Sequence, residues 1–135
     1  MFLSDGEFQE GQTWEALMSM AFHKISNLKI VVDVNGQQVD GKTCDVMNLE
    51  PLLEKISSFG ASVKQVDGHD LVALNNAFKT IHQNKPLVVL AKTSPFRGME
   101  ILEKRYPFLH YVRFKDENEK EEFKSFLNEM KLRKT

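Results

Sequence analysis

Two short stretches decide the fold: residues 4–11, SDGEFQEG, and residues 33–36, DVNG. The first places Asp5 in a tight glycine turn, and the second places Asn35 at the end of an apolar run 30 positions later. In a parallel α/β sheet such points lie side by side at the carboxyl ends of neighbouring strands, where ligands bind. A carboxylate oxygen, an amide oxygen and a turn carbonyl after Asn35 suit Mg²⁺, which completes its octahedron with water and substrate phosphates. The sequence therefore predicts a magnesium site at this edge of the sheet.

Strand-like and helix-like segments alternate outward from these stretches. Short apolar runs predict a strand that ends at Ser4 and further strands at residues 29–35, 62–66 and 86–91. A long polar loop is expected through residues 41–47. Because strands and helices alternate, we expect an α/β fold with a mostly parallel sheet of about four strands flanked by helices.

Four helices are expected between and after these strands, each with its own start signal. Thr13 is the expected cap of the first helix, Asn48 of the second, and His69 or Asp70 of the third, while Gly60 ends the second. Their expected apolar faces are Trp14, Leu17, Met18, Ala21 and Phe22 in the first; Leu52, Leu53 and Ile56 in the second; and Leu71, Leu74, Phe78 and Ile81 in the third. The terminal helix is marked by Phe123, Phe126, Leu127 and Met130.

Several motifs, in their order and spacing, resemble those of transketolases. That family usually has Gly-Asp-Gly, followed by an Asn at the spacing seen here. The resemblance covers residues 1–93 and is thin afterwards. It is carried by residues 5–11, 14–16, 23–24, 27–28, 33–41, 46–51 and 66–70. Ser4 departs from the family, in which glycine is usual at that position.

The resemblance implies a cofactor and a set of residues that hold it. Thiamine diphosphate would be anchored through Mg²⁺ by the Asp5 side chain, the Asn35 side chain and the backbone carbonyl of Gln37. Gly6 would let the chain approach the diphosphate closely, and Glu7 belongs to the same cofactor-binding turn. The structural alternatives are a turn aspartate for Asp5 and a strand-ending asparagine for Asn35. No catalytic residue is assigned.

The implied activity is transfer of a two-carbon ketol unit between sugar phosphates. The chain reads as a single domain, residues 1–135, that corresponds to the C-terminal half of a transketolase diphosphate-binding domain; residues 94–135 carry no assigned role. A partner chain or self-association would have to supply the rest of the cofactor site, and the first strand would leave a sheet edge that needs a partner. The alternative is a non-catalytic interaction module or remnant.

Residues 36–43, GQQVDGKT, fit the phosphate-loop pattern G-x-x-x-x-G-K-[ST] and follow a strand. A nucleotide-binding domain is therefore a rival interpretation. It needs a helix that begins at Lys42 or Thr43, so that backbone N–H groups surround the phosphates. We expect the next helix to begin only at Asn48, and the later strand at 87–91 ends without an acidic metal ligand. Both points disfavour the nucleotide interpretation.

Other polar residues have structural readings beside the functional ones. Among the four histidines, His23 is expected to be structural, His69 to lie in a loop and helix cap, and His82 to lie on the surface. His110 falls where a substrate histidine sometimes occurs in relatives. For Glu10 the resemblance gives a family glutamate near the dimer contact, against a carboxylate that complements the helix dipole. The side chains of Arg97, Arg105 and Arg113 are expected to be solvated rather than bound to phosphate.

The composition excludes several classes of protein. Eighteen basic and nineteen acidic residues give a net charge of −1, so no nucleic-acid or anionic-membrane partner is indicated. A single cysteine, Cys44, rules out an intramolecular disulfide framework and favours a reducing compartment. Because no apolar run approaches the ~20 residues of a membrane span, the expected location is the cytoplasm.

Overall fold

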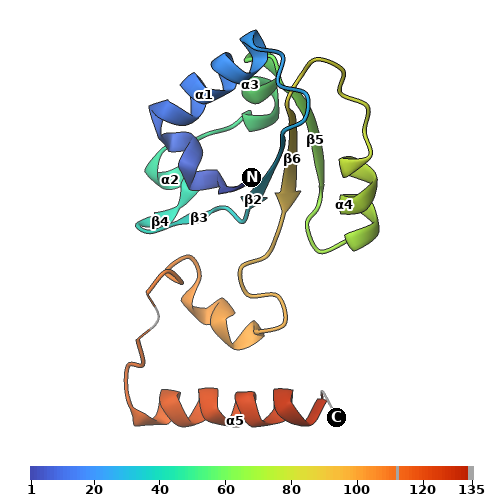
Figure 1. Ribbon diagram of the computed structural model, residues 1–135. Coiled ribbons are helices and arrows are strands. Elements are labelled where there is room, and N and C mark those ends of the chain that lie inside the picture. The colour runs from blue at the N-terminus through green and yellow to red at the C-terminus, as the bar shows by residue number, and fades with distance from the viewer. Residues whose placement is uncertain (112, 134–135) are drawn as a thin grey trace.

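The computed structural model describes residues 1–111 and 113–133 of the chain. The main sheet has four described strands, all parallel, in the order β1-β2-β6-β5 (Figure 1). They are β1 (Phe2–Ser4), β2 (Lys29–Val34), β5 (Ser62–Asp67) and β6 (Leu87–Lys92). The expected α/β fold is confirmed, and each strand lies within one residue of its predicted bounds.

Helices cover both faces of this sheet (Figure 1). One face packs against α1 (Gly11–Phe22) and α3 (Leu52–Ser58), and the other packs against α4 (Leu71–Phe78). Side chains alternate along β6, so Val88 and Leu90 join the first core while Leu87 and Val89 join the second. Because β6 is central and covered twice, every residue from 87 to 91 is buried.

Short elements connect the strands at their carboxyl ends. The 3₁₀ turn η1 (Asp5–Gln9) follows β1 directly. After β2 the chain forms a two-stranded hairpin and one turn of helix, in place of the polar loop expected there. These elements are β3 (Gln37–Gln38), β4 (Gly41–Lys42) and α2 (Thr43–Val46).

Two predicted helix starts are wrong. Glu10 is the N-cap residue of α1, and Thr13 lies inside that helix, where its hydroxyl donates to the Glu7 carbonyl at 2.7 Å. The N-cap of α3 is Pro51, and the Asn48 side chain instead accepts the Glu50 N–H at 3.0 Å. The segment before α1 is the 3₁₀ turn η1 and that before α3 is a loop, and each has its own side-chain hydrogen bonds.

The end of α3 and the start of α4 agree with their predicted signals. Gly60, with φ +94°, follows the end of α3 in a left-handed conformation that favours glycine. Asp70 caps α4, accepting the N–H groups of Val72 and Ala73 at 2.8 and 3.0 Å.

Four predicted inward-facing residues point to solvent instead. Leu71 and Ile81 are 79% and 81% exposed, and Phe22 and Met18 are also exposed. Because α4 ends at Phe78, Ile81 lies beyond the helix whose spacing predicted its burial. Leu74, Ala77 and Phe78 do face the sheet.

The C-terminal segment lies below the sheet in Figure 1, and its Tyr106 ring contacts Lys42 of the β3–β4 hairpin. It contains the 3₁₀ helix η2 (Glu100–Arg105) and the terminal helix α5 (Glu117–Arg133). The Arg105 guanidinium pairs with the Glu119 carboxylate at 2.5 Å and so joins the two elements. No helix among the described residues is long and apolar enough to cross a bilayer.

Candidate functional site

The carboxyl ends of the four strands form one edge of the sheet, and polar residues lie along it. Asp5 follows β1, Asn35 follows β2, Thr93 follows β6, and His69 follows β5 by two positions. The parallel pairing aligns these ends because Ser4 pairs with Asp33, and Val34 pairs with Lys92. The two side chains that the sequence singled out as metal ligands, on Asp5 and Asn35, thus directly follow two neighbouring strands, β1 and β2.

Asp5 is buried, with a 3% exposed fraction. Its Oδ2 accepts the Gly36 N–H at 2.9 Å and the Thr43 hydroxyl at 3.2 Å, whereas Oδ1 is buried without a hydrogen-bond partner among the described residues. Burial raises the pKa of the Asp5 carboxyl, and the bonds from Gly36 and Thr43 oppose that rise. A buried carboxylate oxygen without a partner is costly unless a proton or cation binds it.

Asn35 is held at both ends of its amide group. Its Nδ2 donates to Asp33 Oδ2 at 3.0 Å, and its Oδ1 accepts the Gln37 N–H at 2.9 Å. The second lone pair of Oδ1 is available to another donor or to a cation.

Gln37 contributes through its backbone. The Thr43 N–H donates to the Gly36 carbonyl at 3.0 Å, on the inner side of the β3–β4 hairpin, while the Gly36 N–H donates to Asp5. In an antiparallel ladder the next pair, Gln37 and Lys42, then turns its N–H and C=O groups outward. The Gln37 carbonyl therefore faces away from Lys42, on the edge where its N–H contacts Asn35.

This donor set suits a hard divalent cation. It offers a carboxylate oxygen, an amide oxygen and a carbonyl oxygen, the ligand types that Mg²⁺ takes. Nowhere in residues 1–111 and 113–133 do three or more His, Cys, Asp or Glu side chains gather as a metal site. Any metal bound at this edge would therefore depend on the Asn35 amide and a backbone oxygen beside Asp5.

The family model for the transketolase thiamine diphosphate binding domain matches residues 1–100. The chain belongs to the transketolase family. It is 43% identical over 105 residues to the transketolase family protein y4mO of Sinorhizobium fredii, covering 76% of this chain and 38% of that protein. It is 37% identical over 116 residues to one subunit of the apulose-4-phosphate transketolase of Actinobacillus succinogenes, covering 85% of this chain and 42% of that relative.

Solved transketolases have the same fold. The complex of a Pichia stipitis transketolase variant with fructose-6-phosphate aligns with a TM-score of 0.62 and 31% identity. The alignment covers 68% of this chain and 14% of that structure. This transketolase-family chain thus spans about two fifths of the length of the two relatives above.

Gly6 and Glu7, which the resemblance placed at the cofactor, have local roles in the fold. A Cβ on Gly6 would lie 3.4 Å from Gln38 Cβ, which is an ordinary van der Waals contact, so η1 packs directly against the hairpin at this position. Glu7 Oε2 accepts the Ser4 N–H at 2.6 Å and the Ser4 hydroxyl at 3.2 Å, forming a capping box. The serine that departs from the family pattern is thus bonded within its own turn.

A pocket of about 180 Å³ opens beside Asp5. Gly36, Lys42 and Thr43 contribute to its lining, and Tyr106 reaches it from the C-terminal segment. The Lys42 ammonium lies 5.9 Å from the centre of the Tyr106 ring, a cation–π arrangement. A positive charge and a phenol hydroxyl therefore line the same hollow as the buried carboxylate.

The residues of the phosphate-loop pattern do not form a phosphate loop. They build the β3–β4 hairpin, and the Thr43 hydroxyl is bonded to Asp5. The expectation that no helix begins before Asn48 is wrong, because α2 begins at Thr43. However, α2 is a single turn of four residues, and the Lys42 ammonium lies over Tyr106.

The four histidines lie outside the Asp5 pocket. His23 ends α1 with its ring 5.0 Å from that of Phe22, and His110 stacks edge-on to Tyr111 at 4.8 Å. The His82 ring contacts the Lys85 carbonyl at 2.9 Å. His69 Nε2 accepts the Ser94 N–H at 2.8 Å, linking the ends of β5 and β6.

Sequence reasoning gave no individual role to Asp33, Thr93 or Tyr106, and it named Thr43 only as a residue of the rival phosphate loop. A signal existed for Asp33, because it precedes Asn35 by two positions and alternate strand residues share a face. At this site Thr43 contacts Asp5, Thr93 contacts Asp33 and Tyr106 contacts Lys42, across 38, 60 and 64 positions, and nothing local indicates these contacts. Of the three arginines, Arg105 pairs with Glu119 instead of being solvated.

Proposed function

We propose that this chain forms the diphosphate-holding part of a thiamine diphosphate site, in an assembly that transfers a two-carbon ketol unit between sugar phosphates. The observation that carries the proposal is the buried Asp5 carboxylate: one of its oxygens has no described partner, and the other accepts the N–H of Gly36, the residue between Asn35 and Gln37. The matched domain model and the transketolase relatives support it.

Each of these residues has a definite task in the proposed site. Asp5, Asn35 and the Gln37 carbonyl would hold Mg²⁺, which in turn would hold the diphosphate. Bonds from Gly36 and Thr43 keep the Asp5 carboxylate in place before any cation arrives, so little reorganisation accompanies binding. When bound, thiamine diphosphate supplies the carbon nucleophile for the transfer, and the protein supplies placement and electrostatics.

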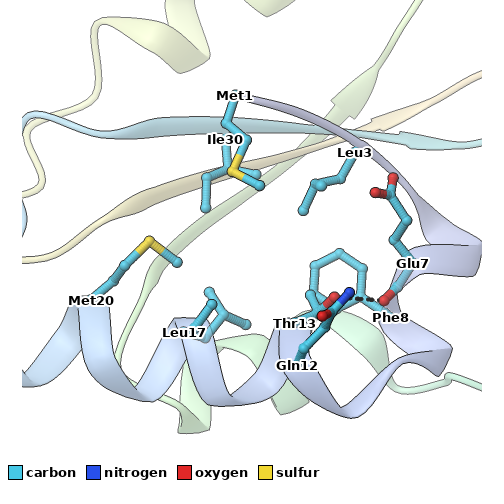
Figure 2. Close-up of a pocket in the computed structure, with 10 residues that line it drawn as sticks. Met1, Leu3, Glu7, Phe8, Gln12, Thr13, Leu17, Met20 and Ile30 are labelled. Atoms are coloured by element: carbon cyan, nitrogen blue, oxygen red, sulfur yellow. Dashed lines mark hydrogen bonds between the residues drawn. The ribbon is translucent and has the colours of Figure 1, made fainter.

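A protein partner would complete the assembly. Strand β1 pairs with β2 alone in the described sheet; its first residue, Phe2, is 71% exposed, and Met1, just before it, is 66% exposed. Next to it lies an apolar hollow of about 310 Å³. Figure 2 shows Met1, Leu3 and Ile30 on one side of this hollow, facing Leu17 and Met20 on the other.

An exposed strand edge beside an apolar hollow suits the addition of a further strand with one inserted side chain. The Actinobacillus relative is named as one subunit of a transketolase, and the present chain spans a minor part of that relative. We therefore propose a second polypeptide at the β1 edge, with self-association as the other outcome of a sedimentation measurement.

The test is calorimetric titration of the chain with thiamine diphosphate and Mg²⁺, with ATP and Mg²⁺ in parallel. We expect saturable, metal-dependent binding of thiamine diphosphate that Asp5→Ala abolishes. Asp40→Ala is the matched control, because Asp40 is an exposed carboxylate of the same loop region and its removal should leave binding unchanged. Equal binding by wild type and Asp5→Ala would contradict the metal assignment, and binding of ATP alone would revive the nucleotide interpretation.

A non-catalytic interaction module is the second candidate. The exposed apolar side chains Phe108, Tyr111 and Phe114 of the C-terminal segment favour it. This interpretation predicts a folded chain that binds neither cofactor, alone or with its partner.

A further inference from the structure

We propose that Asp33 is a positioning residue that sets the orientation of the Asn35 amide at the candidate metal site, with Thr93 holding Asp33 in turn. The inference rests on the proposed function, since it concerns the same site. It assigns roles to two residues that are not themselves proposed ligands.

The chemistry of Asp33 fixes which way the Asn35 amide faces. An ionised carboxylate accepts hydrogen bonds and donates none, so the group 3.0 Å from Asp33 Oδ2 must be the Asn35 NH₂. The amide oxygen then faces the opposite way, toward the Gln37 N–H at 2.9 Å. A flipped amide would put oxygen against carboxylate and NH₂ against N–H, and both contacts would be repulsive.

Both oxygens of Asp33 are engaged, which separates its role from that of a ligand. Oδ1 accepts the Thr93 hydroxyl, and Oδ2 accepts the Asn35 amide. Asp5, by contrast, has one oxygen without a described partner. Asp33 therefore acts on a cation through Asn35, in the way that outer residues orient metal ligands.

Thr93 is itself held firmly at the end of β6. Its N–H donates to the Val34 carbonyl at 3.1 Å, continuing the β2–β6 pairing. On its other side, a Cβ built on Gly68 would lie 2.5 Å from Thr93 Cγ2 and 3.0 Å from the Lys92 carbonyl. The Thr93 methyl thus fills space that only glycine at position 68 leaves open, and this packing directs the hydroxyl toward Asp33.

Three variants test this series of hydrogen bonds from Thr93 through Asp33 to Asn35. Asp33→Asn keeps the shape but can donate as well as accept, so the Asn35 amide loses its fixed orientation. Thr93→Val keeps the shape of Thr93 and removes its hydroxyl, whereas Thr93→Ser keeps the hydroxyl and is the matched control. All three are made in the full chain, and their unfolding in urea is measured alongside binding.

Binding of thiamine diphosphate with Mg²⁺ should weaken about 10–100-fold in Asp33→Asn. Thr93→Val should also weaken this binding, whereas Thr93→Ser should retain wild-type affinity. Wild-type affinity in Asp33→Asn, or equal losses in the two Thr93 variants, would overturn the inference. If Asp33→Asn does not fold, the difference in affinity between Thr93→Val and Thr93→Ser tests the inference by itself.

A second measurement needs no cofactor. In the metal-free wild type, NMR signals of the Asn35 NH₂ group should show slow hydrogen exchange, and Asp33→Asn should speed it. Unchanged exchange in Asp33→Asn would overturn the inference. If the wild type binds no thiamine diphosphate, the proposed function fails, while this exchange measurement still decides whether Asp33 orients Asn35.

Discussion

The sheet region (residues 1–93) and the C-terminal segment (residues 94–135) are held together by different forces. The sheet region buries strands on both faces, and its candidate site is built from hydrogen bonds between neighbouring strand ends. In the C-terminal segment η2 and α5 meet through the Arg105–Glu119 and Lys104–Glu122 ion pairs, and the Phe114 ring lies 5.4 Å from that of Phe123 on α5. Burial of apolar strands therefore dominates the sheet region, whereas ion pairs and aromatic ring contacts join the elements of the C-terminal segment.

The largest expected effect is on the free energy of unfolding, when a buried leucine of the sheet region and an exposed leucine of the C-terminal segment are each truncated. Leu90→Ala should lower the free energy of unfolding by about 2–5 kcal/mol, because it opens a cavity where Leu90 is 1% exposed. Leu127→Ala, at a residue of α5 that is 51% exposed, should change it by no more than about 0.5 kcal/mol. Urea unfolding of both variants checks this, and similar losses would mean that α5 belongs to the same cooperative unit.

A pair of glycines sharpens the comparison. Gly60 and Gly98 both have positive φ, at +94° and +77°, so an added Cβ strains the backbone at either position. A Cβ on Gly60 would also lie 2.8 Å from Ala21 Cβ, whereas one on Gly98 would meet no described atom within 4 Å.

Gly60→Ala should therefore lower the unfolding free energy of the sheet by about 1–3 kcal/mol. Gly98→Ala should leave the sheet transition nearly unchanged and increase hydrogen exchange only in its own segment. Equal losses in the sheet transition would show that the two regions are coupled more tightly than their contacts indicate.

The buried carboxyl of the sheet region should give stability that falls as pH rises. Burial raises the pKa of Asp5, so the folded state binds this proton more tightly than the unfolded state does. In metal-free buffer the wild type should lose stability relative to Asp5→Asn as pH rises from the ordinary carboxyl value of about 3.9 through the raised pKa. Parallel pH profiles of the two proteins would contradict this interpretation.

The carboxyl of the tail should act with the opposite sign and a smaller effect. The Lys115 N–H, followed by the Arg105 guanidinium, lowers the pKa of Glu119. The stability that Glu119 contributes is therefore fully present above the ordinary carboxyl pKa and is lost as the pH falls through the lowered pKa of Glu119. In wild type, limited proteolysis of α5 should accelerate as the pH falls through the lowered pKa of Glu119. In Glu119→Gln, the proteolysis rate should be high at every pH.

Glu121→Gln is the control for that measurement. Glu121 pairs with Lys124 on the same helix and does not join α5 to η2 in the described structure. Its loss should leave the proteolysis profile as in wild type, and an equal effect would assign the pH dependence to helix charge in general.

Local signals predicted the strands and failed on several helix faces. Strands such as residues 29–34 and 87–92 are nearly continuous apolar runs, which a doubly covered sheet requires. Leu71 and Ile81 fit the helical spacing, but Leu71 is the first residue of α4 and Ile81 lies beyond its end, so neither side chain packs on the sheet as Phe78 does. Spacing shows which residues share a face, and helix length decides how much of that face is covered.

The sequence by itself determined the transketolase-like fold and placed Asp5 and Asn35 at one edge of a parallel sheet, because strand runs and turns are local properties. Only the tertiary structure decided which hydrogen bonds connect the residues along that edge. Thr93 bonds Asp33 across 60 positions, and Thr43 bonds Asp5 across 38. The reason is physical: strand order brings distant residues into contact, and a hydrogen bond depends on spatial distance rather than on separation along the chain.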